Sequence, residues 1–274
     1  MAALSHRVFF AVSVVWATFA LVAPPSAHGQ DYAREQRWAD ETLPGVVVGD
    51  AVRIKAASGR EFFALYTEGN AATLAKSSPD SKPAIVLVHG VGVHPDFGII
   101  GVLRVKLADL GYATLAIQMP VQGKDATVDD YFPKVFPDAA DRMVKAAEWL
   151  RAKGHDKVVL LSHSMGAWMA NVYLDQAFDA TPYKAWIVMG LTGSYSWTMR
   201  RFAMPILDVY GENDIAPVLG AVGRRKFALK ESNGSRQVKI AAADHHYLGR
   251  ENELVAAIDV FLRERIAPAL FRQR

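Results

Sequence analysis

A five-residue segment between a predicted strand and a predicted helix constrains this chain more than any other feature. Ser162 to Gly166, SHSMG, follows the apolar run 158–161 and precedes the helix-like stretch 167–174. Strand and helix cross closely at so short a turn, so small residues are needed two positions before and after the central serine. Ser162 and Gly166 are small, although glycine is commoner at both places. The pattern is typical of a nucleophile elbow, which exposes the hydroxyl of its serine, here Ser164.

Two more predicted strands end in residues that a reactive serine needs. One is followed by Glu212 and Asp214, and the last is followed by His245 and His246. A serine hydroxyl is a poor nucleophile until a histidine takes its proton, and that histidine needs a carboxylate to fix its tautomer. The chain order serine, acid, histidine is the one expected after a serine on a strand-turn-helix elbow. The elbow motif alone is also compatible with an ordinary structural turn that has no catalytic role. The chain order of serine, acid and histidine favours a catalytic serine over such a turn.

Together these segments resemble the α/β-hydrolase superfamily, over nearly all of the chain after its N-terminal segment. The resemblance implies a mostly parallel twisted sheet with an N-terminal antiparallel hairpin and helices on both faces. The apolar run 84–88 breaks into His89-Gly90-Val91-Gly92, which corresponds to the oxyanion loop. Backbone N–H groups of Val91 and Met165 are then expected to bind the oxyanion of a tetrahedral intermediate. The segment 89–115 also resembles an exported proteobacterial family of α/β-hydrolase-like proteins without an assigned function.

The resemblance also separates the candidate acids and bases. Asp214 is favoured as the acid because the fold keeps a carboxylate just past this strand, and Glu212 is the weaker substitute. His245 is favoured as the base because Ala-Asp-His followed by bulky residues resembles a segment of many small hydrolases in which the first histidine acts. His246 then packs or lines the rim. His163 is a poor base because side chains of adjacent residues diverge at a sharp turn.

Substrate contacts come from loops, about which the sequence says less. The residues expected to line the substrate site are His89, Gly92, His163, Tyr195, Trp197 and His246. Asp96 is expected to cap a helix that begins near Phe97, and a substrate role is the alternative. No large helical lid fits in the loops 119–136 and 191–204, so we expect an open cleft.

Residues 1–29 have the features of a secretory signal peptide. Arg7 precedes the apolar stretch 8–22, and the small residues Ala27 and Gly29 suit a cleavage site before Gln30. An uncleaved anchor is the alternative, but the stretch is shorter than the roughly 20 residues that span a membrane. We expect cleavage, no stable membrane span afterwards, a periplasmic or secreted protein, and a single domain over residues 30–274.

Composition points to no nucleic acid, metal or cofactor. The 31 basic and 28 acidic residues give a net charge of +3, too small to favour a polyanionic partner. His94 and Asp96 have no further ligand at helical spacing, so we expect no metal. The chain has no cysteine, hence no disulfide. The sequence carries no signal for an oligomeric state.

Strands and helices alternate through the rest of the chain. Strands are expected at 84–88, 112–117, 157–162, 184–189, 205–210 and 236–241, after a hairpin of 46–55 with 61–66, and helices near 97–110, 137–153, 165–178, 216–229 and 251–265. Such alternation predicts an α/β fold whose ligands bind at the carboxyl ends of the strands.

These observations predict a serine hydrolase that cleaves carboxylic esters with small or medium acyl groups. Thioesters, lactones and amides undergo the same attack, so they remain alternatives. An alternative from another class is an envelope binding protein that keeps the scaffold without turnover.

Overall fold

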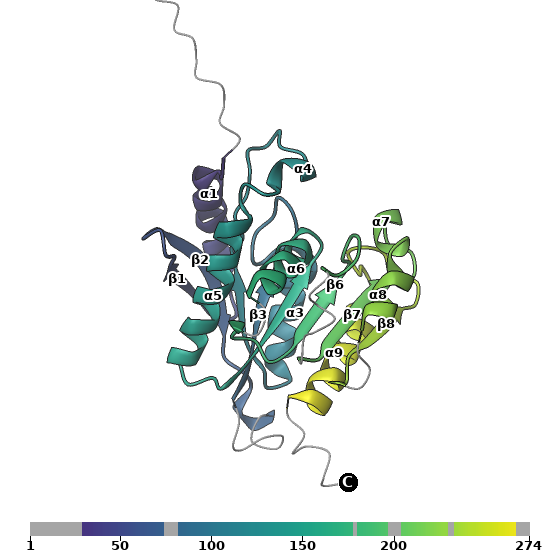
Figure 1. The fold of residues 1–274 in the computed structure, drawn as a ribbon. Helices are drawn as coiled ribbons and strands as arrows, with labels where there is room; N and C mark the ends of the chain where they lie inside the picture. The colour runs from purple at the N-terminus through teal and green to yellow at the C-terminus, as the bar shows by residue number, and fades with distance from the viewer. Residues whose placement is uncertain (1–28, 74–81, 178–179, 197–203, 230–232, 267–274) are drawn as a thin grey trace, which may run out of the picture.

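The computed structural model describes residues 29–73, 82–177, 180–196, 204–229 and 233–266. In this part of the chain, eight strands form one sheet in the order β1-β2-β4-β3-β5-β6-β7-β8. Their bounds are β1 Asp50–Lys55, β2 Glu61–Thr67, β3 Pro83–Val88, β4 Ala113–Ile117, β5 Lys157–His163, β6 Trp186–Met189, β7 Ile206–Gly211 and β8 Arg236–Ile240. Figure 1 shows the twist that runs across these strands.

The sheet is mostly parallel, with an antiparallel hairpin at its N-terminal end. β1 pairs with β2, and β2 with β4, in antiparallel fashion, and every other neighbouring pair is parallel. In the central strands Val88 pairs with Ser162, and His163 with Met189. Three parallel strands therefore end side by side, which brings the loops that follow them to one edge of the sheet.

The helices are α1 Tyr32–Thr42, η1 Leu43–Gly45 (3-10), α3 Gly98–Asp109, α4 Val128–Tyr131, α5 Phe136–Ala152, α6 Met165–Ala177, α7 Ala216–Leu219, α8 Val222–Ala228 and α9 Glu251–Arg265. In Figure 1, α5 and α6 lie in front of the sheet and α3 behind it. Strand side chains alternate between the faces, so Val86 and Val88 pack with α5 and α6 while Ile85 and Leu87 pack with α3 and α9. The predicted α/β arrangement is confirmed.

The structure differs from the prediction in the segment 216–229 and at the N-terminal helix α1. The helix expected over 216–229 is divided into α7 and α8, which Gly220 and Ala221 separate. Helix α1 was not predicted at all. Asp31 caps it by accepting a hydrogen bond from the N–H of Arg34, but only Glu35 and Ala39 of its residues are buried. A helix with so little buried surface lacks the apolar periodicity that identifies helices in a sequence.

The predicted capping role of Asp96 is wrong. Helix α3 has Phe97 as its N-cap residue, without a side-chain hydrogen bond. The carboxylate of Asp96 instead accepts from Nε and Nη2 of Arg104, at 3.0 and 2.7 Å. Arg104 is buried, and a buried guanidinium needs an anionic partner more than a helix end that water can solvate.

None of the helices that the structure describes is both long enough and apolar enough to cross a membrane. The predicted signal peptide lies outside the described residues.

Candidate active site

Ser164 occupies a strained turn between β5 and α6. Its φ of 56° lies in the left-handed region, which residues other than glycine rarely adopt. The start of α6 lies so close to the end of the neighbouring strand β3 that a Cβ at Gly166 would lie 2.4 Å from the carbonyl oxygen of His89. Ser162 is buried, and its hydroxyl accepts a hydrogen bond from the indole of Trp186 at 2.8 Å. The small residues of the motif therefore match the space available around this turn.

The structure brings Ser164, His245 and Asp214 together as a chain of hydrogen bonds. Oγ of Ser164 lies 3.0 Å from Nε2 of His245, and Nδ1 of His245 lies 2.6 Å from Oδ1 of Asp214. Burial alone raises the pKa of Asp214, but hydrogen bonds from His245 and from the N–H groups of Gly211 and Ile215 lower it overall. The ionised carboxylate holds the proton of the imidazole on Nδ1, which leaves Nε2 free to accept from the serine hydroxyl.

The neighbouring candidates take other positions. His246 is exposed, with its ring centroid 5.3 Å from that of His245. Glu212 is exposed as well and pairs with Lys239 at 2.6 Å. Gly190, which follows β6, lies against the imidazole of His245, since a Cβ there would be 2.9 Å from Cε1. Gly190 was not predicted to belong to the site, although its position directly after a buried strand could have identified it as a site residue.

The loop after β3 lies against Ser164. A Cβ at Gly90 would be 3.3 Å from Cβ of the serine, a tight contact that glycine avoids. Met165 is the first residue of α6, where backbone N–H groups have no partner within the helix. Val91, the other expected donor, is partly exposed, and within the described residues its N–H has no protein acceptor. Such N–H groups suit a developing oxyanion.

His89 holds the peptide that carries the N–H of Val91. The N–H of Met119 donates to Nε2 of His89 at 2.9 Å, so the imidazole proton is on Nδ1 and donates to the carbonyl of Gly90 at 2.8 Å. Burial lowers the pKa of His89 to about 3, which keeps this arrangement neutral. The carbonyl of Gly90 and the N–H of Val91 belong to one trans peptide and point in opposite directions. The N–H is therefore directed away from His89.

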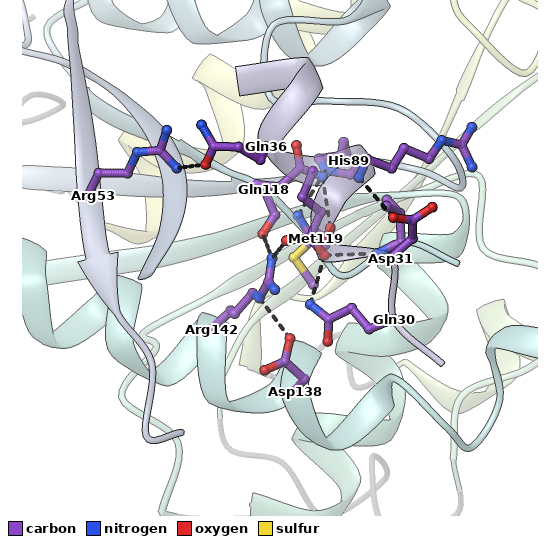
Figure 2. A network of polar contacts seen from close by, with 12 residues as sticks. Gln30, Asp31, Gln36, Arg53, His89, Gln118, Met119, Asp138 and Arg142 are labelled. Carbon is purple, nitrogen blue, oxygen red and sulfur yellow. Dashed lines mark hydrogen bonds and ion pairs between the residues drawn. The ribbon is translucent and has the colours of Figure 1, made fainter. Parts of the chain in front are cut away.

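A buried ion pair connects helix α1 to this histidine (Figure 2). Oε2 of Glu35 lies 2.8 Å from Nη1 of Arg142, and both side chains are buried. The same Nη1 donates to the backbone carbonyl of Gln118, whose side-chain amide donates to His89. Asp138, one turn before on α5, is a second anion 2.8 Å from Arg142. Helix α1 and the loop after β3, which carries His89 and Val91, are thus connected by one polar network.

Removal of this arginine is expected to destabilise the fold strongly. In Arg142→Met, Glu35 loses the cation that offsets the cost of burying its charge, so the free energy of unfolding should fall by about 3–5 kcal/mol in urea titrations. The double variant Glu35→Leu/Arg142→Met should recover part of this loss, because the buried carboxylate of Glu35 is removed as well and only Asp138, which is less buried, lacks its cation. Lys145→Met, which removes an exposed pair with Glu148, is the control and should change nothing measurable. A double variant no more stable than Arg142→Met would contradict this interpretation.

A pocket of about 80 Å³ opens beside the serine. Ser164 lies on its rim, and its walls come from the loop after β3, the start of α3, and three histidines that were expected to line the substrate site: His89, His163 and His246. Phe97, Ile99 and Ile100 also line the pocket and were not predicted to do so. They lie at the start of α3, and the packing of this helix against the sheet, which brings them to the pocket, cannot be read from a local sequence pattern.

The other expected lining residues lie elsewhere. Tyr195 packs against Trp186, with ring centroids 5.7 Å apart, and borders a second pocket in which Ser164 takes no part. Gly92 belongs to the loop after β3 but does not line the pocket beside the serine, and Arg34 of α1 approaches it. Trp197 lies outside the described residues. Within those residues, no group of three His, Asp or Glu side chains is arranged to bind a metal ion.

The sequence and the fold both match known proteins. A family model described as the alpha/beta hydrolase family matches residues 85–271. The chain belongs to this family. The match confirms the superfamily that the motifs indicated and supports hydrolytic activity. No curated protein matches the chain in sequence.

Several solved alpha/beta hydrolase structures share the fold. Est1E from Butyrivibrio proteoclasticus is 16% identical, with a TM-score of 0.60 over 79% of this chain and 99% of its own. XC6422 from Xanthomonas campestris, described as a serine hydrolase without a lid, is 17% identical, with a TM-score of 0.57 over 80% and 95%. Dienelactone hydrolase from Anabaena variabilis is 19% identical, with a TM-score of 0.59 over 79% and 97%. At these identities the likenesses show the fold alone.

Proposed function

We propose that this alpha/beta hydrolase is a serine hydrolase that cleaves carboxylic esters. The observation that carries the proposal is the chain of hydrogen bonds from Asp214 through His245 to Ser164, at 2.6 and 3.0 Å. The three side chains come from loops after three different strands, so only the folded protein brings them together. A serine, a neutral histidine and a buried carboxylate in this order perform nucleophilic acyl transfer.

In the proposed mechanism, Oγ of Ser164 attacks the ester carbonyl while Nε2 of His245 takes the hydroxyl proton. Asp214 stabilises the imidazolium that forms, and the N–H groups of Val91 and Met165 bind the oxyanion. Collapse of the tetrahedral intermediate breaks the bond to the alcohol, and His245 returns the proton to the leaving oxygen. Water then attacks the acyl-enzyme by the same route, which regenerates the serine and releases the acid.

An ester is favoured over an amide because an alcohol leaves the acyl carbon more readily than an amine does. The pocket beside Ser164 is small, about 80 Å³, which suits a short acyl chain and no macromolecular substrate. The name of dienelactone hydrolase from Anabaena variabilis refers to hydrolysis of a lactone by that protein, and the same serine attack would open a lactone here. Thioesters, lactones and amides remain substrates of the same attack.

Export of the mature protein is part of the proposal. It is supported by the basic, apolar and small-residue segments of residues 1–29. The narrower resemblance to an exported proteobacterial family stays a prediction, and so does cleavage before Gln30.

Covalent labelling with a fluorophosphonate probe tests the proposed function directly. Such a probe reacts with an activated serine and stops at a stable phosphonate ester. We expect one adduct by intact-mass measurement, and peptide mapping should place it on Ser164. A folded protein without an adduct would contradict the hydrolase proposal and favour the binding protein on the same scaffold.

A further inference from the structure

His163 has one ring nitrogen, Nδ1, without a hydrogen-bond partner in the part of the protein that the structure describes. Its side chain is buried, with 5% of the residue exposed. Nε2 lies 2.8 Å from the backbone carbonyl oxygen of His245. A carbonyl oxygen only accepts hydrogen bonds, so the imidazole proton is on Nε2 and Nδ1 carries a free lone pair. Within the described residues no donor reaches that Nδ1.

The environment of His163 keeps it neutral. Burial lowers its pKa to about 4, and the neighbouring ring of His245, with its centroid 4.9 Å away, disfavours a second positive charge. Asp214 acts in the opposite direction, more weakly. Near neutral pH, Nδ1 is therefore a hydrogen-bond acceptor and not a donor.

This acceptor faces the pocket beside the serine. A Cβ at Gly90 would lie 3.7 Å from Nδ1 of His163 and also 3.7 Å from Oγ of Ser164. Because residue 90 is glycine, the space between these two atoms is open. Both residues line the same pocket of about 80 Å³, whose far wall is apolar and includes Ile99 and Ile100. Nδ1 of His163 is not among the fully buried polar atoms that lack a partner, so water in the open pocket can donate to it. An acyl chain that fills the pocket displaces this water, and the acceptor is then unpaired unless the chain itself donates to it.

The pocket receives the acyl side of an ester. The leaving oxygen must lie near Nε2 of His245, which returns its proton, and His245 does not line the pocket. The acyl carbon lies over Oγ of Ser164, at the pocket rim. The acyl chain is thus the substituent that points past Gly90. The pocket volume of about 80 Å³ is small for a ligand site, which favours a short acyl chain.

We propose that the pocket selects short acyl chains that carry a hydroxyl group, and that this hydroxyl donates a hydrogen bond to Nδ1 of His163. The inference rests on the proposed function and adds the substrate class to it. His163 is then a specificity-determining residue, which discriminates hydroxyacyl esters from unsubstituted ones of the same length. Discrimination arises because an acyl chain without the hydroxyl leaves the buried acceptor unpaired.

The test compares matched pairs of ethyl esters on the mature protein. The pairs are lactate with propanoate and 3-hydroxybutanoate with butanoate, and both enantiomers of each hydroxyester are used. Each kcat/KM is divided by the rate constant of hydroxide-catalysed hydrolysis, which removes differences in intrinsic reactivity. We expect a normalised preference of about tenfold for at least one hydroxyester, the size of one good neutral hydrogen bond.

Two variants assign the preference to one atom. His163→Gln keeps an amide N–H near the position of Nε2, where it can donate to the carbonyl of His245, but has no acceptor near that of Nδ1. His163→Asn places an amide oxygen near the position of Nδ1. We expect the hydroxyester preference to disappear in the glutamine variant and to persist in part in the asparagine variant. The ratio of two substrates on one variant cancels any effect on the hydrogen bond between His245 and Ser164.

The outcomes separate this inference from the proposed function. Fluorophosphonate labelling of Ser164 together with equal normalised rates for both members of each pair would overturn the hydroxyl assignment alone. A preference that survives unchanged in His163→Gln would do the same. Absence of labelling would overturn the hydrolase proposal and, with it, the substrate class. Should neither variant fold, the wild-type comparison alone still decides.

Discussion

Replacement of Ser164 by alanine is expected to lower kcat for ester hydrolysis by about six orders of magnitude, the loss typical of removing a triad nucleophile. The hydroxyl is the atom that forms the acyl bond in the proposed mechanism, and no other hydroxyl lies within reach of Nε2 of His245 among the described residues. The remaining rate would come from water activated by His245 and from the oxyanion donors.

The same substitution should leave the fold intact. Alanine removes one oxygen from a half-buried position, and the strain of a φ of 56° is present in both proteins. We therefore expect an unchanged circular dichroism spectrum and a free energy of unfolding within about 1 kcal/mol of wild type. Ser58→Ala, at the exposed turn between β1 and β2, is the matched control and should keep full turnover and labelling. Turnover retained by the alanine variant at position 164 would remove this serine from the mechanism.

Features that depend on neighbours in sequence were predictable. The elbow around Ser164 and the residues after β7 and β8 are each a strand followed directly by polar residues, and parallel pairing then aligns the strand ends. Hydrophobic patterning identifies such strands, and the fold decides that their ends meet. For this reason the sequence indicated Asp214 and His245 without information on any distance between them.

Features that depend on partners far along the chain were not predictable. Arg142 and Glu35 are separated by 107 positions, and neither has a pattern that indicates a buried pair. Asp96 pairs with Arg104 and does not cap the helix as predicted. Arg104 needs this partner because it is buried, and its burial arises only when the helix packs against the sheet. Tyr195 likewise follows β6 as expected, but packs into the core against Trp186. A polar or aromatic residue in a loop can face the site or the core, and tertiary packing decides which.

A comparison of variants at the two adjacent histidines distinguishes a histidine that takes part in catalysis from one that only lies beside the site. His245→Ala is expected to lower kcat by about five to six orders of magnitude, because the proposed general base and its hydrogen bond to Asp214 are both lost. His246→Ala should cost less than about tenfold, since this exposed ring borders the pocket without contacting Asp214 or the serine hydroxyl. Both variants are the same substitution in consecutive positions of one loop, so general disturbance of the loop affects them alike.

Rescue by added imidazole tests whether the missing ring of His245 acts as a base. In His245→Ala, the vacated space lies between Asp214 and Ser164, whose atoms were 2.6 and 3.0 Å from the two ring nitrogens. A free imidazole bound there meets the same carboxylate and the same hydroxyl, so kcat should rise with its concentration and with the fraction of neutral imidazole. His246→Ala has no such vacancy and should show no rescue. If instead His246→Ala carries the large loss, Asp214 must orient a different ring during turnover, and the hydrogen bonds of this structure describe a resting arrangement of the loop after β8.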